Sequence, residues 1–295
     1  MAKKRKNFRN SLINPDKFHV SQIKFYIILA PLIAFMSLPI IFIINHAFKP
    51  LDELMMFPPR FFTQRPTTNN FIMLFRMAES AQPASVYLFN TLWITAATVF
   101  ASVVMSVCAG YVLSKVNFRG RETLFKINQI SMMFVPIAVM IPRYLVIAGL
   151  GILDTPLVHI LPLMAMPVGL FLVKQFIDSG VPDALVEAAK IDGASDYFIV
   201  WKIITPLIKP AISTLVILSF QMSWSATEAS AMFIERESLR TFAFLASSLV
   251  DRSIGSLAGM GVAAAAALFM FVPSFIVFMI VQSGVMNTMS HSGIK

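Results

Sequence analysis

Charged side chains are scarce in this chain of 295 residues. They make up 13% of the sequence, which is half of the roughly 25% found in a soluble domain. Hydrophobic residues reach 57%, and the mean hydropathy is +0.74. Stretches that alternate apolar and polar residues, as barrel strands do, are also scarce. These shortages exclude an ordinary soluble domain and predict an integral membrane protein built from helices, which satisfy their own backbone groups in lipid.

Several groups that enzymes use are missing as well. The single cysteine, Cys108, lies in an apolar run, so no disulfide can form within the chain and a buried structural thiol is expected. No Gly-x4-Gly-Lys-Ser/Thr segment occurs, so the chain lacks the loop that holds ATP phosphates. No His-Glu-x-x-His segment occurs either, and His46 and His159 stand alone. We therefore expect no catalytic residue, no cofactor and no metal in this chain.

Six apolar segments are long enough to cross a membrane, since a bilayer core of about 30 Å needs about 20 helical residues. The predicted spans are Phe25–Phe48, Val86–Leu113, Ile127–Leu153, Pro156–Val173, Ala211–Phe233 and Leu257–Val285. The first is too long for the apolar part of a signal peptide, and no small-x-small cleavage site follows it, so we expect it to be retained. The prediction is a transmembrane domain over residues 25–285, with a basic N-terminal tail, 1–24, and a C-terminal tail, 286–295.

The 24 Lys and Arg residues are distributed unevenly among the predicted loops, and the net charge is +9. Sixteen of them fall on the side that holds both tails, the loop between spans two and three, and the loop between spans four and five. Under the positive-inside rule that side is the cytoplasm, so both termini are expected there. Membrane topology accounts for the positive charge better than nucleic-acid binding does, and we expect no nucleic-acid partner.

The loop between spans four and five contains a short segment of mixed polarity, about residues 182–206. Pro182 and Asp183 are typical of the first turn of a helix, and Gly193 permits the left-handed residue that would end it. The apolar residues Leu185, Ala188, Ala189 and Ile191 fall broadly on one side. A second helix is expected over about 196–204, ending before Pro206. Two short helices that meet at a glycine corner are predicted to form a compact protrusion that fits a cleft in another protein. The alternative for this segment is an amphipathic helix that lies on the lipid surface.

The spacing of this segment resembles the Glu-Ala-Ala loop in the membrane subunits of bacterial ABC importers. That pattern is Glu-Ala-Ala, three residues, Gly, nine residues, Ile, one residue, Leu-Pro. The chain matches it at Glu187, Ala188, Ala189, Gly193, Ile203 and Pro206, and departs from it at Thr205, where Leu is usual. The resemblance implies that the loop docks onto a separate ATPase, with Glu187 facing a basic residue, Asp192 beside it and Gly193 at the corner. ATP and Mg²⁺ would be bound by that partner ATPase.

Other segments resemble the maltose-type permeases of carbohydrate ABC importers. They are Asn90-Thr91-Leu92, Gly110-Tyr111-Val112-Leu113-Ser114-Lys115 and Gly149-Leu150-Gly151-Ile152-Leu153-Asp154-Thr155. The resemblance implies an all-α membrane protein with six transmembrane helices and the ABC importer type I permease fold, in the cell membrane of a prokaryote. It also implies the partners: a second permease subunit, a dimer of ATP-binding subunits, an extracellular solute-binding protein, membrane lipid, and a sugar or oligosaccharide solute. The C-terminal tail would also reach toward the ATPase pair.

The fifth span carries the candidate residues of the translocation path, which are Gln221, Trp224 and Glu228. Trp224 is able to stack on a sugar face, although tryptophans are more often interfacial. Glu228 and Arg143 are charges within predicted spans, and we expect both to reach the outer interface; the alternative is that each faces a cavity or a partner. The segment from Ser223 to Thr227 departs from the family's Ser-Trp-Asn-Glu/Asp-Phe, so the solute is not assigned by analogy with known sugar systems.

The predicted outer loop, residues 234–256, has mixed charge that suits a wet surface. The resemblance implies contact with the solute-binding protein there, with Arg236 and Arg240 as candidate contacts. The alternative is a solvated connector without a partner. Two other functions remain less favoured: a secondary transporter, which normally needs more spans and a polar midplane site, and a membrane enzyme, whose catalytic groups are missing. An ABC permease for a solute other than a sugar also stays open.

Overall fold

The computed structural model describes residues 23–76, 82–253 and 257–292, and all regular structure in these residues is helical. The all-α prediction is therefore confirmed for this part of the chain. Most of the predicted N-terminal tail lies outside the described residues. The last helix, α15 (Leu257–Ser292), continues past Val285, so the first part of the predicted C-terminal tail is helical.

Four segments are long and apolar enough to cross a membrane on their own. These are α1 (Ile23–Phe48), α4 (Ala84–Lys115), residues Leu157–Gly180, which hold α7 (Leu157–Met164) and α8 (Pro167–Gly180), and residues Gly259–Gln282 of α15. Two further segments qualify only as bent helix pairs, so the described residues provide up to six spans.

The third predicted span, 127–153, is broken, and the expectation of one continuous helix is wrong. α5 (Arg121–Ser131) meets the helical segment made of η3 (Pro136–Val139) and α6 (Met140–Gly149) at 109°. Pro136 has no backbone N–H to donate to the hydrogen bonds of a preceding helix. Val135 before it takes an extended conformation, with φ −74° and ψ 126°. Pro136 therefore begins a new helical segment after the break.

The fifth predicted span, 211–233, is also divided. α12 (Lys209–Trp224) ends at the turn 225–227, and α13 (Glu228–Met232) is a separate short helix. On its other side, α12 bends by 88° from the run of α10 (Asp196–Phe198), η4 (Ile199–Ile204) and α11 (Thr205–Leu207).

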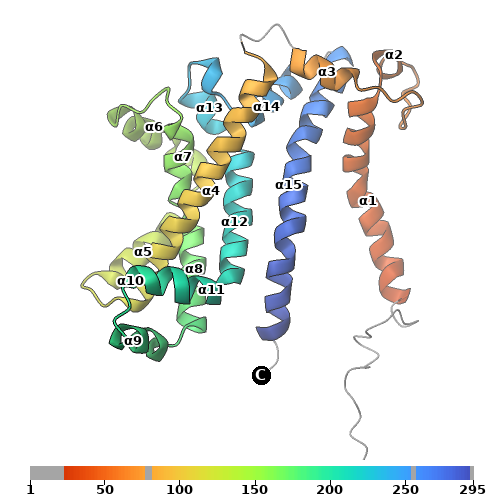
Figure 1. The fold of residues 1–295 in the computed structure, drawn as a ribbon. Helices are drawn as coiled ribbons and strands as arrows, with labels where there is room; N and C mark the ends of the chain where they lie inside the picture. The colour runs from red at the N-terminus through yellow and green to blue at the C-terminus, as the bar shows by residue number, and fades with distance from the viewer. Residues whose placement is uncertain (1–22, 77–81, 254–256, 293–295) are drawn as a thin grey trace, which may run out of the picture.

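The short helices gather at the two ends of the bundle (Figure 1). One end holds α9 (Asp183–Ile191), α10, the start of α1 and the end of α15. The opposite end holds α2 (Leu51–Leu54), α3 (Asn69–Arg76), α6, α13 and α14 (Phe242–Ser253), and η5 (Glu237–Leu239) lies between α13 and α14 in the sequence. The first and last described helices therefore start and finish at the end of the bundle that carries α9 and α10, as an even number of crossings requires.

Close helix contacts hold α4, α8 and α12 together. A Cβ atom on Gly110 would lie 2.7 Å from Cγ1 of Val173, and one on Gly169 would lie 2.5 Å from Cδ1 of Leu215. These glycines let the helices approach closely, as small residues do in membrane bundles. The core beside them contains Val107, Val173, Ile177, Val186, Ile199, Ile204 and Leu215, so the short helices α9 and η4 belong to the same packed unit as the spans.

Candidate functional site

The segment 182–206 forms the predicted corner. Pro182 precedes α9 with an extended backbone, and α9 ends where Asp192 N–H donates to the carbonyl of Ala188 at 3.0 Å. Gly193 follows with φ 80°, a left-handed conformation that favours glycine. The hydroxyl of Ser195 then accepts from the N–H of Phe198 and caps α10. The chain therefore turns sharply at Gly193, as its spacing predicts.

The second arm of the corner does not end before Pro206, which corrects our expectation. The helical run continues through α11 to Leu207 because it widens into a π-helical turn over η4. The carbonyl of Val200 accepts both the N–H of Thr205 and, at 2.8 Å, its Oγ1. The wider turn accommodates a proline that has no N–H to give. Thr205, the departure from the family pattern, thus supplies one of the hydrogen bonds of this turn.

The apolar face of α9 is also different from the one expected. Val186 and Ala189 pack on the core, whereas Leu185 and Ile191 are exposed, Ile191 at 86%. Two aromatic residues of α10, Tyr197 and Phe198, are exposed as well. An open hollow of about 500 Å³ lies beside the corner and is lined by Ala189, Asp192, Gly193, Ala194, Ser195, Phe198 and Ile203. An exposed apolar rim around a hollow is typical of a protein contact surface.

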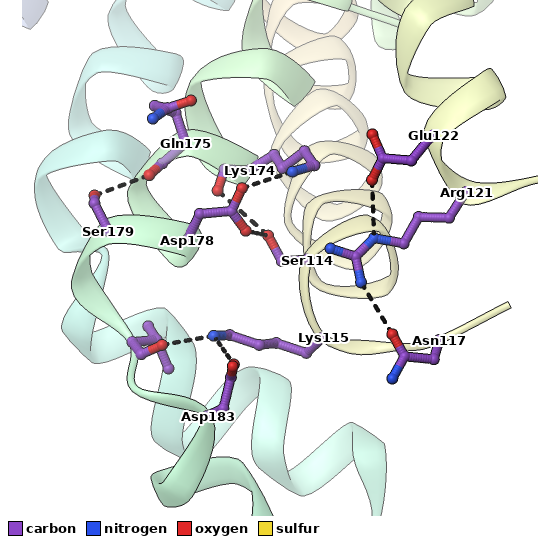
Figure 2. Close-up of polar contacts among 11 residues, drawn as sticks. Ser114, Lys115, Asn117, Arg121, Glu122, Lys174, Gln175, Asp178, Ser179 and Asp183 are labelled. Carbon is purple, nitrogen blue, oxygen red and sulfur yellow. Dashed lines mark hydrogen bonds and ion pairs between the residues drawn. The ribbon is translucent and has the colours of Figure 1, made fainter.

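Three residues at the end of α4 hold the segments around this corner; we call Tyr111, Ser114 and Lys115 the α4 clamp. Tyr111 donates its hydroxyl to Asp196 of α10 at 2.5 Å. Ser114 donates to Asp178 of α8 at 2.5 Å. Their spacing of three and four residues places them on one side of the helix. Figure 2 shows Ser114 and Lys115 directed toward α8 and the start of α9.

Lys115 makes the third connection of the clamp. Its Nζ atom lies 2.5 Å from Oδ1 of Asp183 and donates to the carbonyl of Val181 at 2.6 Å (Figure 2). Lys174 of α8 pairs with Asp178 at 2.6 Å, and Lys190 of α9 lies 3.6 Å from Asp196. Three lysines therefore face three aspartates. The pair of Lys115 with Asp183 was missed from the sequence because the two residues are 68 positions apart, whereas Lys174 and Asp178 lie one turn apart in α8.

Glu187 and Asp192 differ from the other acidic residues of the corner. Both are exposed, and neither side chain has a hydrogen-bond or ion-pair partner among the described residues. Asp178, Asp183 and Asp196 already have internal cations beside them. The two free carboxylates are thus the negative charges that the corner offers to another molecule. Ala188 and Pro206 are also exposed, whereas Ile203 packs partly on the core.

The candidate path residues occupy three different environments. Gln221 is exposed on α12. Trp224 is 2% exposed, donates Nε1–H to the carbonyl of Met270 at 2.9 Å and stacks on Phe220, so it joins α12 to α15. Its role in stacking on a solute stays a prediction, and little of its surface is open in this structure.

Glu228 forms an ion pair with Arg143, a pairing that the sequence did not predict. Arg143 Nη1 lies 2.8 Å from Glu228 Oε1, and the side chains are 30% and 40% exposed. The pair joins α6 to α13 at the end of the bundle opposite the corner. Pairing lowers the cost of placing each charge near lipid.

Arg236 and Arg240, the candidate contacts for a binding protein, both make internal contacts. Arg236 Nε lies 2.6 Å from Oδ2 of Asp154, and Arg240 lies over the ring of Phe244 at 4.8 Å. The backbone N–H of Arg236 lowers the pKa of Asp154 below its usual value, and the Arg236 guanidinium and the N–H of Glu235 lower it further. Arg236 keeps 62% of its side chain exposed, so a role in contacting a partner stays a prediction.

The described residues contain no group of three or more His, Cys, Asp or Glu side chains placed to hold a metal ion.

Residues 102–285 match the family described as binding-protein-dependent transport system inner membrane component. The chain belongs to this family. The matched part begins inside α4 and includes the clamp, the corner and nearly all of α15. The chain is thus a multi-pass membrane subunit of a binding-protein-dependent transport system.

Curated relatives in the family extend over much of the chain. The arabinooligosaccharides transport system permease protein AraQ of Halalkalibacterium halodurans is 31% identical over 200 residues, which cover 65% of this chain and 69% of that protein. The melibiose/raffinose/stachyose import permease protein MelC of Bacillus subtilis is 27% identical, over 70% of this chain and 74% of that protein. A crystal structure of a bacterial ABC transporter involved in the import of the acidic polysaccharide alginate contains a similar chain. It has a TM-score of 0.75 and 24% identity, and the match covers 90% of this chain and 98% of that one, so it supports the permease fold.

Proposed function

We propose that this chain is one of two permease subunits of an ABC importer for a sugar or oligosaccharide. It forms half of the translocation path and carries out no chemical step itself. The observation that carries the proposal is the corner at Gly193, which presents the free carboxylates of Glu187 and Asp192 beside an apolar hollow. Such a surface suits a partner with a basic rim and an apolar centre.

ATP hydrolysis is assigned to a partner. A dimer of ATP-binding subunits would hold ATP and Mg²⁺ and dock on the corner, one copy on this chain and one on the second permease. The end of the bundle that carries α9 and α10 is therefore proposed to face the cytoplasm, together with both termini. The positive-inside distribution of Lys and Arg supports this orientation independently.

The remaining partners lie along and above the membrane. Large apolar side chains of α4, among them Phe89 at 66% and Phe100 at 71% exposure, need lipid or the second permease as a neighbour. At the opposite end, the segment 234–242 and α14 form the surface proposed for an extracellular solute-binding protein. Arg236 keeps 62% of its side chain exposed there while it pairs with Asp154.

The printed names of the relatives support a carbohydrate as the solute. One relative is named for arabinooligosaccharides, another for melibiose, raffinose and stachyose, and the structural neighbour serves the import of alginate. The residues after Trp224 depart from the usual pattern of maltose-type permeases, which keeps a solute other than a sugar as the second candidate.

A purification and an uptake assay test the proposal together. The affinity-tagged chain is extracted from its own cells in a mild detergent, and the co-purifying proteins are identified by mass spectrometry. We expect an ATPase, a second permease and Mg-ATP hydrolysis in the eluate. Uptake of labelled oligosaccharides should then depend on this chain. An eluate without an ATPase would contradict the proposal, and uptake of a non-carbohydrate alone would favour the second candidate.

A further inference from the structure

α4 is attached at both ends to surfaces that other proteins are proposed to bind. Its last residues form the clamp on the corner, through Tyr111, Ser114 and Lys115. Near its beginning, Asn90 and Thr91 hold the segment that follows α13. Figure 1 shows α4 running from the end that carries α10 to the end that carries α13 and α14. One helix therefore touches both surfaces.

At the clamp, two connections hold the two arms of the corner separately. Lys115 holds the first residue of α9, and Tyr111 holds the first residue of α10. Gly193 lies between these two points. Because both arms are tied to the same turn of α4, the corner cannot rotate as a unit without pulling on that turn.

At the other end, the contacts are equally direct. Asn90 Nδ2 donates to the carbonyls of Ser238 at 2.7 Å and Arg240 at 3.1 Å. The hydroxyl of Thr91 accepts from the N–H of Phe242 at 2.7 Å. Asn90 is 8% exposed and Thr91 is 1% exposed, so water competes little for these bonds. They tie the segment 238–242 to the second turn of α4.

The helix between the two ends is suited to transmit displacement. α4 is continuous over 32 residues and contains no proline. The other candidate spans in the described chain contain prolines, such as Pro31, Pro162 and Pro273, or are bent pairs. At 1.5 Å per residue, the stretch from Asn90 to Tyr111 is about 31 Å long. A continuous helix of this kind moves as one body more readily than a kinked or broken one.

We propose that α4 is a rigid link between the corner and the outer segment 238–242, with Tyr111 and Asn90 as its positioning residues. Movement of the corner by a docked ATPase is passed along α4 to the outer segment, and movement of the outer segment is passed back to the corner. The two surfaces are then energetically coupled, and the coupling is reciprocal. This inference rests on the proposed function, because it needs an ATPase at the corner.

A spin label tests the link without knowledge of the solute. In a Cys108→Ala background, Glu235→Cys provides one labelling site beside the outer segment, and the whole importer is purified with its co-purifying ATPase. The nitroxide spectrum is recorded with and without the non-hydrolysable nucleotide Mg-AMP-PNP. We expect nucleotide to change the spectrum, and Tyr111→Phe or Asn90→Leu to remove at least half of that change. Thr91→Val gives a second test at the outer end.

Matched controls separate a broken link from general damage. Ser179→Ala and Ser248→Ala remove hydroxyls that bond only within their own helices, and both should keep the full nucleotide response. These two control variants should also retain the wild-type amount of ATPase and its basal hydrolysis. An unchanged response in both Tyr111→Phe and Asn90→Leu, or an unresponsive wild-type spectrum, would overturn the rigid link alone. A wild-type sample without any ATPase would contradict the proposed function, and it would overturn the rigid link as well.

Discussion

The Nζ atom of Lys115 lies 2.5 Å from Oδ1 of Asp183, so the last residue of α4 holds the first residue of α9. The lysine side chain is 6% exposed and the aspartate 80%, which places the pair at the boundary between the packed bundle and water. Asp183 also lies in the first turn of α9, where a negative charge is favourable. The pair therefore fixes where the corner leaves the bundle.

Replacing Lys115 tests this attachment. Lys115→Met keeps most of the apolar stem but removes the donor to Asp183 and Val181, and Lys115→Arg keeps a cation. We expect the methionine variant to lose about 1–2 kcal/mol of stability, because a charged hydrogen bond is lost while Asp183 stays solvated. Thermal unfolding in detergent, followed by tryptophan fluorescence, provides the measurement. Equal midpoints for wild type and Lys115→Met would show that the attachment contributes nothing.

Gly193 provides a second prediction. At φ 80°, a side chain strains the backbone, while no atom lies within 4 Å of the position of an added Cβ. The backbone conformation alone should therefore set the loss of folding stability. Gly193→Ala should lower the free energy of unfolding by about 1–2 kcal/mol, which is more than Gly193→Asn lowers it. Gly193→Leu should also obstruct docking and uncouple ATP hydrolysis from uptake. Gly149→Ala is the matched control, since it also adds a Cβ into open space but without a positive φ. If Gly193→Asn proves as costly as Gly193→Ala, backbone strain is not the reason for the glycine.

The contact between Asp154 and Arg236 predicts a dependence on pH. The pKa of Asp154 is lowered in the folded chain, so the contact stabilises the outer segment at pH values above the usual aspartate pKa of about 3.9. That contribution is lost as the pH falls below this value and through the lowered pKa. The mobility of a nitroxide attached to Glu235→Cys in the Cys108→Ala background should therefore increase below about pH 4. In the Asp154→Asn variant, the nitroxide should already be mobile at neutral pH and should lack this transition; an identical profile in both proteins would refute the assignment.

The proposed orientation is tested with two single cysteines in the Cys108→Ala background. Ile191→Cys lies on the exposed corner, and Glu235→Cys lies at the opposite end of the bundle. In intact cells, a membrane-impermeant thiol reagent should modify only Glu235→Cys, and in inverted vesicles only Ile191→Cys. Modification of both from the same face would rule out the single crossing predicted between the corner and the segment 234–242.

The features that were predictable from the sequence are local ones. The corner followed from fixed spacing between Glu187 and Pro206, and the spans followed from apolar runs. The break at Pro136 was not predictable, because a proline within a span kinks one helix and ends another according to what packs around it. The clamp, the pair of Arg143 with Glu228 and the contact of Asp154 with Arg236 each join residues more than 60 positions apart. Such pairs depend on helix packing, which a single sequence does not specify.

The most direct test of the account concerns Glu187. The affinity-tagged chain is purified as wild type, as Glu187→Ala and as Glu122→Ala, an acidic control on α5 that forms only a surface pair with Arg121. The amount of co-purifying ATPase and the uptake of labelled oligosaccharide are measured for each. A charged contact of about 1.5–3 kcal/mol corresponds to a loss of affinity of about ten- to hundredfold. We predict that Glu187→Ala loses most of the bound ATPase and its uptake while the protein still inserts in the membrane, and that Glu122→Ala behaves as wild type. Wild-type amounts of ATPase and wild-type uptake in Glu187→Ala would contradict the assignment of the corner as the docking site.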